Sequence, residues 1–424
     1  MKYDVPSPYK SAIYGLVFWL FIYLLAPVKY AYPLSFAAIS LLLFSYVLFF
    51  AGYWFGNAIK LVRKPYEVPI ERKWLFNLFL FIAIGSAILI ACDKFLLRGV
   101  SLSNGAFANR EILQDNSPTI IGIVGNIFKA AVFISLFLYF QFGLKNKVLL
   151  WLNYGILGYF IIENFFVGSR SIPVFYTVLF VLILVHFKKV RLRLKYILGI
   201  SILGIVFFVF LTELYISRTI EFMGTRSRAI EFILMKGSYM DYTKVDKEFI
   251  TFVMSLDSYY LQSFFVGLIS FLVYYLHSVI EFSYLIDNFS SDAQMGSHTF
   301  FVISKFFQLI FGTYDGRSLD YVPRLGKYTT FFGDIYMDFK YLLSIFMFFF
   351  GYWQARLYKT AVVKSNFIVI PLLLFLCILN FIFPVFNLIS GGNGIYLIIG
   401  FIILGLFYKI LSAYNFTFHV DKNT

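Results

Sequence analysis

The chain has 424 residues, of which 60% are hydrophobic and 14% are charged, and its mean hydropathy is +0.80. A soluble domain of this size does not need so much apolar surface, and several apolar stretches are long enough to cross a hydrocarbon core of roughly 30 Å. The sequence therefore predicts an all-α polytopic integral membrane protein. Its net charge of +14 comes from short basic clusters between apolar runs, a distribution that indicates membrane topology and not nucleic-acid binding.

Ten membrane-spanning helices are predicted from the apolar runs. They are expected at about residues 11–28, 34–57, 73–92, 118–142, 148–166, 172–187, 196–214, 340–358, 366–384 and 395–413. The N-terminal stretch MKYDVPSPYK lacks the features of a cleaved signal peptide, so the first helix is expected to remain as a span. The two cysteines, Cys92 and Cys377, lie in apolar runs and predict neither a disulfide framework nor a thiolate metal site.

Basic residues mark one side of the predicted membrane. Lysines and arginines crowd the loops at 60–73, 145–147, 188–195 and 356–364, and counting the spans places all four loops on the same side. The positive-inside rule makes that side cytoplasmic, with both termini there. Fourteen of the 22 acidic residues lie between Glu213 and Asp338, so the segment that joins the seventh and eighth spans is expected to be external.

The predicted organisation has three parts: helices one to seven in residues 1–215, an external loop domain in 216–339, and helices eight to ten with a cytoplasmic tail in 340–424. The loop domain contains two apolar stretches, at 264–280 and 300–312. Either both are amphipathic or re-entrant, or they form a hairpin that carries the polar connector between them to the inside. The first interpretation is preferred because that connector contains no Lys or Arg.

The turn between the fifth and sixth spans, VGSRSIP, carries Arg170 at the predicted external surface. Charge at membrane depth is costly, so an arginine in this position indicates a functional site. Ser169 and Ser171 leave backbone N–H groups near the N-terminus of the returning helix, where an anion is favoured, and a guanidinium group can bind phosphate there. The alternative is an arginine at a hairpin tip, paired with Glu163.

Further arginines lie on the predicted external side, close to span ends. They are Arg110, Arg218, Arg226, Arg228, Arg317 and Arg324. A guanidinium group binds phosphate oxygens through two parallel hydrogen bonds, so several such groups around one cleft could hold a diphosphate without a metal. For any single member, a solvated or acid-paired surface arginine is the alternative.

The segment PRLGKYTTFFGDIYMDFKYL opens the eighth predicted span. Asp334 and Asp338 lie on one face of it if it is helical, and Tyr328 is just upstream; substrate binding and helix capping are both open for these residues. Two external histidines, His277 and His298, could remove a proton from an attacking hydroxyl near neutral pH. A structural role is the alternative for each histidine.

The sequence lacks the GxxxxGK[ST], HExxH, GxSxG, CxxC and DxD patterns, which leaves NTPase, zinc protease, hydrolase, thiol redox and metal-dependent nucleotide-sugar activities without support. In contrast, GSRS after a span, a large external loop late in the chain and TFFGDIYMDF at the start of the next span resemble the oligosaccharide repeat-unit polymerases. These are the Wzy-type O-antigen or capsule polymerases of the bacterial inner membrane. The likeness covers the whole chain in architecture, and Lys340 departs from it because relatives often carry glycine there.

The resemblance implies a metal-independent, GT-C-like membrane fold similar to that of O-antigen ligases and SEDS proteins, with no cofactor. The implied substrate is a polyprenyl-pyrophosphate-linked oligosaccharide, held among membrane lipids, whose growing glycan passes to a hydroxyl of a new repeat unit on the periplasmic face. A chain-length regulator and a flippase are further implied partners. The implied site has pyrophosphate-binding Arg170, Arg110, Arg218, Arg226 and Arg324, a base among His298, His277 and Asp334, and substrate contacts from Ser169, Ser171, Glu163, Tyr328 and Asp338.

A lipid-linked oligosaccharide flippase is the main alternative, and it would need polar residues through the depth of several spans. A membrane acyltransferase would need a histidine deep in the spans. An O-antigen ligase is the nearest alternative, because it differs mainly in its acceptor.

Overall fold

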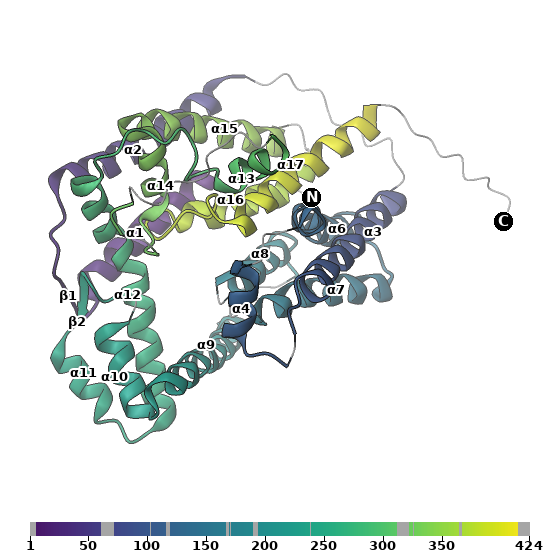
Figure 1. Cartoon of the computed structure of the whole chain (residues 1–424). Helices are drawn as coiled ribbons and strands as arrows, with labels where there is room; N and C mark the ends of the chain where they lie inside the picture. Colours follow the sequence, from purple (N-terminus) through teal and green to yellow (C-terminus); the bar gives the residue numbers. More distant parts are fainter. Residues whose placement is uncertain are drawn as a thin grey trace.

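The computed structural model describes residues 6–413 except 61–71, 102, 116–118, 167–168, 170, 190–193, 238, 312–321, 325 and 364–366. Within these residues almost all regular structure is helical, as Figure 1 shows. The one sheet among them has two short antiparallel strands, β1 (Val28–Tyr30) and β2 (Thr243–Val245), which join the loop after the first helix to the predicted loop domain. The predicted all-α class is confirmed.

The first half of the chain forms α1 (Pro8–Leu25), α2 (Phe36–Ala58), α3 (Arg72–Ala91), the π-helical segment η1 (Cys92–Leu97), α4 (Ala106–Asp115), α5 (Ile120–Phe128), α6 (Ala130–Gln141), α7 (Lys147–Phe165), α8 (Ser171–His186) and α9 (Leu194–Met223). The second half forms α10 (Arg226–Lys236), α11 (Lys247–Met254), α12 (Tyr259–Asn288), α13 (Phe301–Phe311), α14 (Thr330–Phe339), η2 (Lys340–Leu342), α15 (Leu343–Val363), η3 (Phe367–Val369), α16 (Ile370–Phe381) and α17 (Gly392–Ala413).

Each of the ten predicted spans coincides with helix. Among the described residues, eight helices are long and apolar enough to cross a membrane: seven of the predicted spans, and α12. Helix α8 and the segment from η3 through α16 are apolar but shorter. The chain is therefore a multi-pass membrane protein, and the number ten stays a prediction. Helix α12 contains the stretch 264–280, and its 30 residues are compatible with a span or with a helix lying in the interface.

Helices α2 and α15 pack side by side and run parallel, because glycines let their backbones approach closely. A Cβ atom on Gly52 would lie 1.9 Å from the carbonyl oxygen of Phe348, and one on Gly56 would lie 2.7 Å from that of Tyr352. These glycines are four residues apart and share one face of α2. Small residues at such spacing are typical of helix contacts in membranes, where close van der Waals packing replaces the hydrophobic drive.

The ends of the helices at the basic loops gather together. The carbonyl oxygen of Ile59, just after α2, accepts hydrogen bonds from Arg356 Nη1 and Lys359 Nζ, each at 3.1 Å. These cations complement the negative end of the α2 dipole. At the ends of α8 and α6, Lys189 Nζ lies 5.5 Å from the ring centre of Phe140. Helix ends next to the basic loops thus meet in two pairs, as expected if those loops share one side; which side is cytoplasmic stays a prediction.

We expect Gly52→Ala to destabilise the protein, because the added methyl group would collide with the backbone of α15. Overpacking of this kind typically costs about 1–3 kcal/mol, so the thermal midpoint of the purified protein in detergent should fall by several degrees. Gly155→Ala is the matched control, since a Cβ atom at Gly155 in α7 meets nothing within 4 Å. Equal midpoints for the two variants would contradict the close α2–α15 contact.

Candidate functional site

A cavity of about 1580 Å³ lies between two groups of helices. Figure 1 shows the groups: α3, α4, α7 and α8 on one side, α12 and α16 on the other. Pockets for drug-sized ligands usually have volumes of roughly 300–1,000 Å³, so this cavity can hold a larger molecule. Its lining differs strongly from one region to another.

Three cations line the cavity on the side of α3 and α4. They are Lys94 and Arg98, in and just after η1, and Arg110 on α4; we call them the cationic wall. The neutral polar side chains of Asn126, Asn164, Ser169 and Ser171 line the cavity beside them. The arrangement presents positive charge and hydrogen-bonding groups to whatever occupies this region.

The position of Asp93 and Lys94 follows from the π-helical turn in which they lie. Such wide turns are rare and often occur at functional sites. The Thr119 hydroxyl donates to Asp93 Oδ1 at 2.6 Å and also accepts a hydrogen bond from the Gly122 N–H at 3.1 Å, as the N-cap of α5. A Cβ atom at Gly122 would lie 2.4 Å from the Asp93 carboxyl carbon, so glycine leaves the room that Asp93 occupies.

Hydrogen bonds and an ion pair position Arg98 and the helix that carries Arg110. Arg98 Nη1 lies 3.7 Å from Asp93 Oδ2, and the same guanidinium donates to the carbonyl oxygen of Leu113 in α4. On α4, the buried Asn109 amide donates to the carbonyl oxygen of Phe166 at 3.2 Å, which fixes the helix that carries Arg110 against the end of α7.

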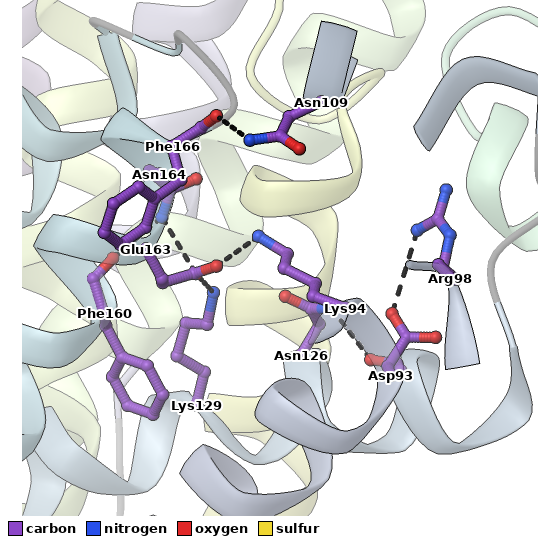
Figure 2. Close-up of polar contacts among 11 residues, drawn as sticks. Asp93, Lys94, Arg98, Asn109, Asn126, Lys129, Phe160, Glu163, Asn164 and Phe166 are labelled. Carbon is purple, nitrogen blue, oxygen red and sulfur yellow. Dashed lines mark hydrogen bonds and ion pairs between the residues drawn. The ribbon is translucent and has the colours of Figure 1, made fainter. Parts of the chain in front are cut away.

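Lys94 of the cationic wall also belongs to a buried triad of charges with Lys129 and Glu163, shown in Figure 2. Glu163, in the last turn of α7, has a side chain that is 0% exposed. Lys94 donates to one carboxylate oxygen, and Lys129 Nζ lies 3.0 Å from the other. The Asn164 amide donates to Glu163 Oε1 at 2.9 Å. Two ammonium groups and one carboxylate leave the triad with a charge of +1.

A cluster of aromatic side chains, the aromatic wall, also lines the cavity. It consists of Tyr239, Tyr274, Tyr328 and Phe386. The ring of Tyr328 lies 5.4 Å from that of Phe386, 5.7 Å from that of Tyr274 and 6.1 Å from that of Tyr239, between ring centres. Three of these residues come from the predicted loop domain. Much of the remaining lining is aliphatic or phenyl, for example Val178, Leu182, Phe208, Leu211, Phe271 and Ile378.

The predicted site residues divide into two sets by their relation to this cavity. Arg110, Ser169, Ser171 and Tyr328 line it, and Glu163 lies directly behind its cationic wall. Arg170 lies outside the described residues, between Ser169 and Ser171. The role predicted for each of them stays a prediction.

Arg226 lies away from the cavity lining formed by the described residues. It forms a bidentate ion pair with Glu213, with both N–O distances at 2.9 Å, and donates to Ser263 Oγ at 2.6 Å. Its guanidinium carbon lies 3.5 Å from the ring centre of Tyr259. These contacts fasten the start of α10 to Glu213 within α9 and to the start of α12. Arg218 is half-buried on α9 and likewise outside the described lining.

Arg324 also belongs to an ion-pair cluster. It donates to Asp241 and lies 3.3 Å from Glu281 Oε2, with its guanidinium carbon 4.2 Å from the ring centre of Tyr242. Lys327 Nζ lies 2.8 Å from Asp241 Oδ2. The hydrogen bond from Lys327 is the main reason that the pKa of the Asp241 carboxyl lies below its usual value; Arg324 lowers it further, and partial burial opposes both.

The three candidate bases do not line the cavity formed by the described residues. His277 is buried in α12, where Nδ1 lies 2.8 Å from the carbonyl oxygen of Tyr274 and the ring packs 4.2 Å from that of Tyr239. The backbone N–H of His298 donates to Asp338 at 2.9 Å, and Asp338 is fully buried. Asp334 is half-buried on α14. Asp338 therefore holds the turn before α13, which matches the capping alternative.

Lys94, Arg98, Asp93 and Lys129 are absent from the residues predicted from sequence. Lys129 had a clear signal, because a lysine inside an apolar span is costly and usually functional. Asp93, Lys94 and Arg98 directly follow the third predicted span, and nothing in the sequence shows that a π-helical turn directs Lys94 and Arg98 into a cavity. Among the described residues, no three His, Cys, Asp or Glu side chains could together hold a metal ion.

Thr119→Val should destabilise the protein, because it removes both the hydrogen bond to Asp93 and the N-cap of α5. A lost cap typically costs about 0.5–2 kcal/mol, and leaving a buried carboxylate without its donor adds to this. Thr119→Ser keeps the hydroxyl and should retain most of the wild-type thermal midpoint in detergent. If the serine variant were as unstable as the valine variant, the hydroxyl contact would not matter.

Comparison of the chain with protein-family models, with curated proteins and with solved structures gives no match. A functional assignment therefore has to rest on the cavity, its two walls and the sequence motifs.

Proposed function

We propose that this protein polymerises polyprenyl-diphosphate-linked oligosaccharide repeat units into a surface polysaccharide, on the outer face of the bacterial inner membrane. One observation carries the proposal: one large cavity is lined by three cations, by a cluster of aromatic side chains and by many apolar side chains. Each region suits one part of a lipid-linked glycan. The GSRS and TFFGDIYMDF motifs favour the same class.

The charge balance of the cationic side favours an anionic ligand. Four cations and two carboxylates lie together there, which leaves a charge of +2, from Lys94, Arg98, Arg110, Lys129, Asp93 and Glu163. Excess positive charge at membrane depth is costly unless an anion compensates it. A diphosphate carries negative charge on several oxygens, and arginine and lysine donors suit it.

The other two regions suit the glycan and the lipid. Aromatic side chains combine an apolar ring with, in tyrosine, a polar hydroxyl, so Tyr239, Tyr274 and Tyr328 can cover the apolar faces of sugar rings and bond to their hydroxyls. The apolar lining suits a polyprenyl chain, whose burial is favourable in proportion to its area. The cavity volume accommodates several such groups at once.

The reaction transfers a glycan between two oxygens. The bond between the anomeric carbon and the diphosphate oxygen breaks, and the polyprenyl diphosphate leaves with the bonding electrons. A bond forms between that carbon and an acceptor hydroxyl, whose proton passes to a base. The fixed cations would stabilise the negative charge that develops on the leaving diphosphate. The predicted candidates for the base, His277, His298 and Asp334, all lie outside the described lining of the cavity.

A flippase is the second candidate function, and one observation favours it. The cavity lining includes Pro6 and Ser11 at the start of α1 and Cys377 on α16. These residues belong to other parts of the chain than the cationic wall. A transport route would need a lining that continues from the cationic wall to the first turns of α1. The cations, however, gather at one end only, which suits a single reaction site better than a route with polar groups along its length.

Arg110→Ala should abolish or strongly reduce chain growth without unfolding the protein, because Arg110 is exposed on α4. Removal of one donor that stabilises developing charge typically lowers a rate by about 10²–10³-fold. A gel of the surface polysaccharide should then show single repeat units in place of a ladder. Lys147→Ala, at the exposed start of α7, is the matched control and should keep the ladder.

Other outcomes of this gel would assign the alternatives. Carrier-linked repeat units stranded on the inner face would indicate a flippase, and long chains left on the carrier lipid would indicate a ligase. An unchanged ladder in Arg110→Ala would contradict the proposed use of the cationic wall.

A further inference from the structure

The two lysines of the buried triad occupy different environments. The Lys129 side chain is 2% exposed, and its ammonium lies 3.0 Å from Glu163 Oε1 and 5.2 Å from the ring centre of Phe160. The Lys94 side chain is 13% exposed and lines the cavity, while its ammonium bonds to the other carboxylate oxygen of Glu163. In Figure 2, the two lysines approach Glu163 from different helices.

We propose that Lys94 is an exchangeable cation, which leaves Glu163 for the diphosphate of the substrate, and that Lys129 is the positioning residue that makes this exchange possible. The inference rests on the proposed function for the identity of the ligand. Arg98, held by Asp93 and the Leu113 carbonyl, stays in place as a fixed cation during the exchange.

The need for two lysines follows from the burial of Glu163. A buried carboxylate that loses its only cationic partner becomes an uncompensated charge, which is strongly unfavourable. With Lys129 on one oxygen, Glu163 keeps a partner after Lys94 turns away. One lysine is enough to compensate the carboxylate of Glu163. The second ammonium group, that of Lys94, can therefore pair with a ligand without leaving a buried charge uncompensated.

Lys94 has the freedom that the exchange requires. A lysine ammonium sits on a flexible four-carbon stem and acts as a point charge, in contrast to the fixed fork of arginine. Only a change of side-chain torsions is needed, because Lys94 already lines the cavity. When the product diphosphate leaves, Lys94 can pair with Glu163 again. Glu163 and the ligand therefore compete for the same ammonium group.

This scheme makes opposite predictions for the two buried partners. In Lys129→Met, Glu163 and Lys94 become an isolated neutral pair, so moving Lys94 strands the carboxylate and diphosphate affinity falls. In Glu163→Gln, the competitor for Lys94 and its negative charge are both removed, so affinity rises. Each dissociation constant should change on the order of tenfold or more, given charges a few ångströms apart at partial burial. In the double variant no carboxylate competes for Lys94 and none is left stranded, so the affinity should exceed that of the wild type. Net charge alone, which returns to +1, would leave it near the wild type.

The test measures the binding of farnesyl diphosphate, a short polyprenyl diphosphate, to the full-length protein in detergent by calorimetry at constant salt and pH. We expect weaker binding by Lys129→Met, tighter binding by Glu163→Gln and by the double variant, and near-wild-type binding by Lys129→Arg. Lys147→Met, at the other end of α7, controls for a general loss of positive charge. Thermal midpoints recorded in parallel identify any variant that does not fold. If a single variant fails to fold, the test rests on Lys129→Arg and on the double variant of Lys129→Met with Glu163→Gln.

A shift in the same direction for both single variants would overturn the exchange, since a merely structural triad would weaken binding in either case. Wild-type affinity in the double variant would overturn it as well, since net charge alone predicts that result. Absence of saturable binding by the wild type would overturn it too. The polymerase assignment is decided separately by the polysaccharide gel: opposite shifts combined with an intact ladder in Arg110→Ala would leave a diphosphate-binding membrane protein of another function.

Discussion

The charged side of the cavity depends on the compensation of one carboxylate, that of Glu163, which has no exposed surface. Glu163, in the last turn of α7, pairs with Lys94 just after α3 and with Lys129 at the junction of α5 and α6. Three stretches far apart in sequence are thereby held at one point. A buried ion pair adds little net stability, and its value here is to specify where the cations lie.

The rest of the fold gives this arrangement a rigid frame and supplies the aromatic part of the cavity lining. The glycine-mediated contact of α2 with α15 makes a close-packed unit on the far side of the cavity. The segment from α10 to α14 adds the tyrosines of the aromatic wall and is fastened by its own ion pairs, Arg226 with Glu213 and Arg324 with Asp241. Arginines that look alike in sequence therefore separate into those that hold the fold together and those that face the cavity.

Helix positions could be predicted well, and the site only in part. Apolar runs identify spans because the length of a helix and the thickness of a membrane constrain them directly, and all ten predicted spans are helical. The pairing of Arg226 with Glu213 was not evident, since it depends on the chain reversing at Gly224, which has a φ of +77°. Lys129 could have been recognised from its place within an apolar run. Lys94 could not, because its direction depends on the local widening of the helix.

That widening has a consequence for how one helix serves two environments. Successive residues of an α-helix are rotated by about 100°, and a π-helical turn accommodates an extra residue in the same rise. The stripe of α3 that packs against α5 and α6 is thus out of phase with Asp93, Lys94 and Arg98 beyond it. Deleting one residue between 92 and 97 would restore the α-helical phase and place these ionic groups on another side of the helix. The π-helical turn thus lets one face of the helix pack against its neighbours while Lys94 and Arg98 face the cavity.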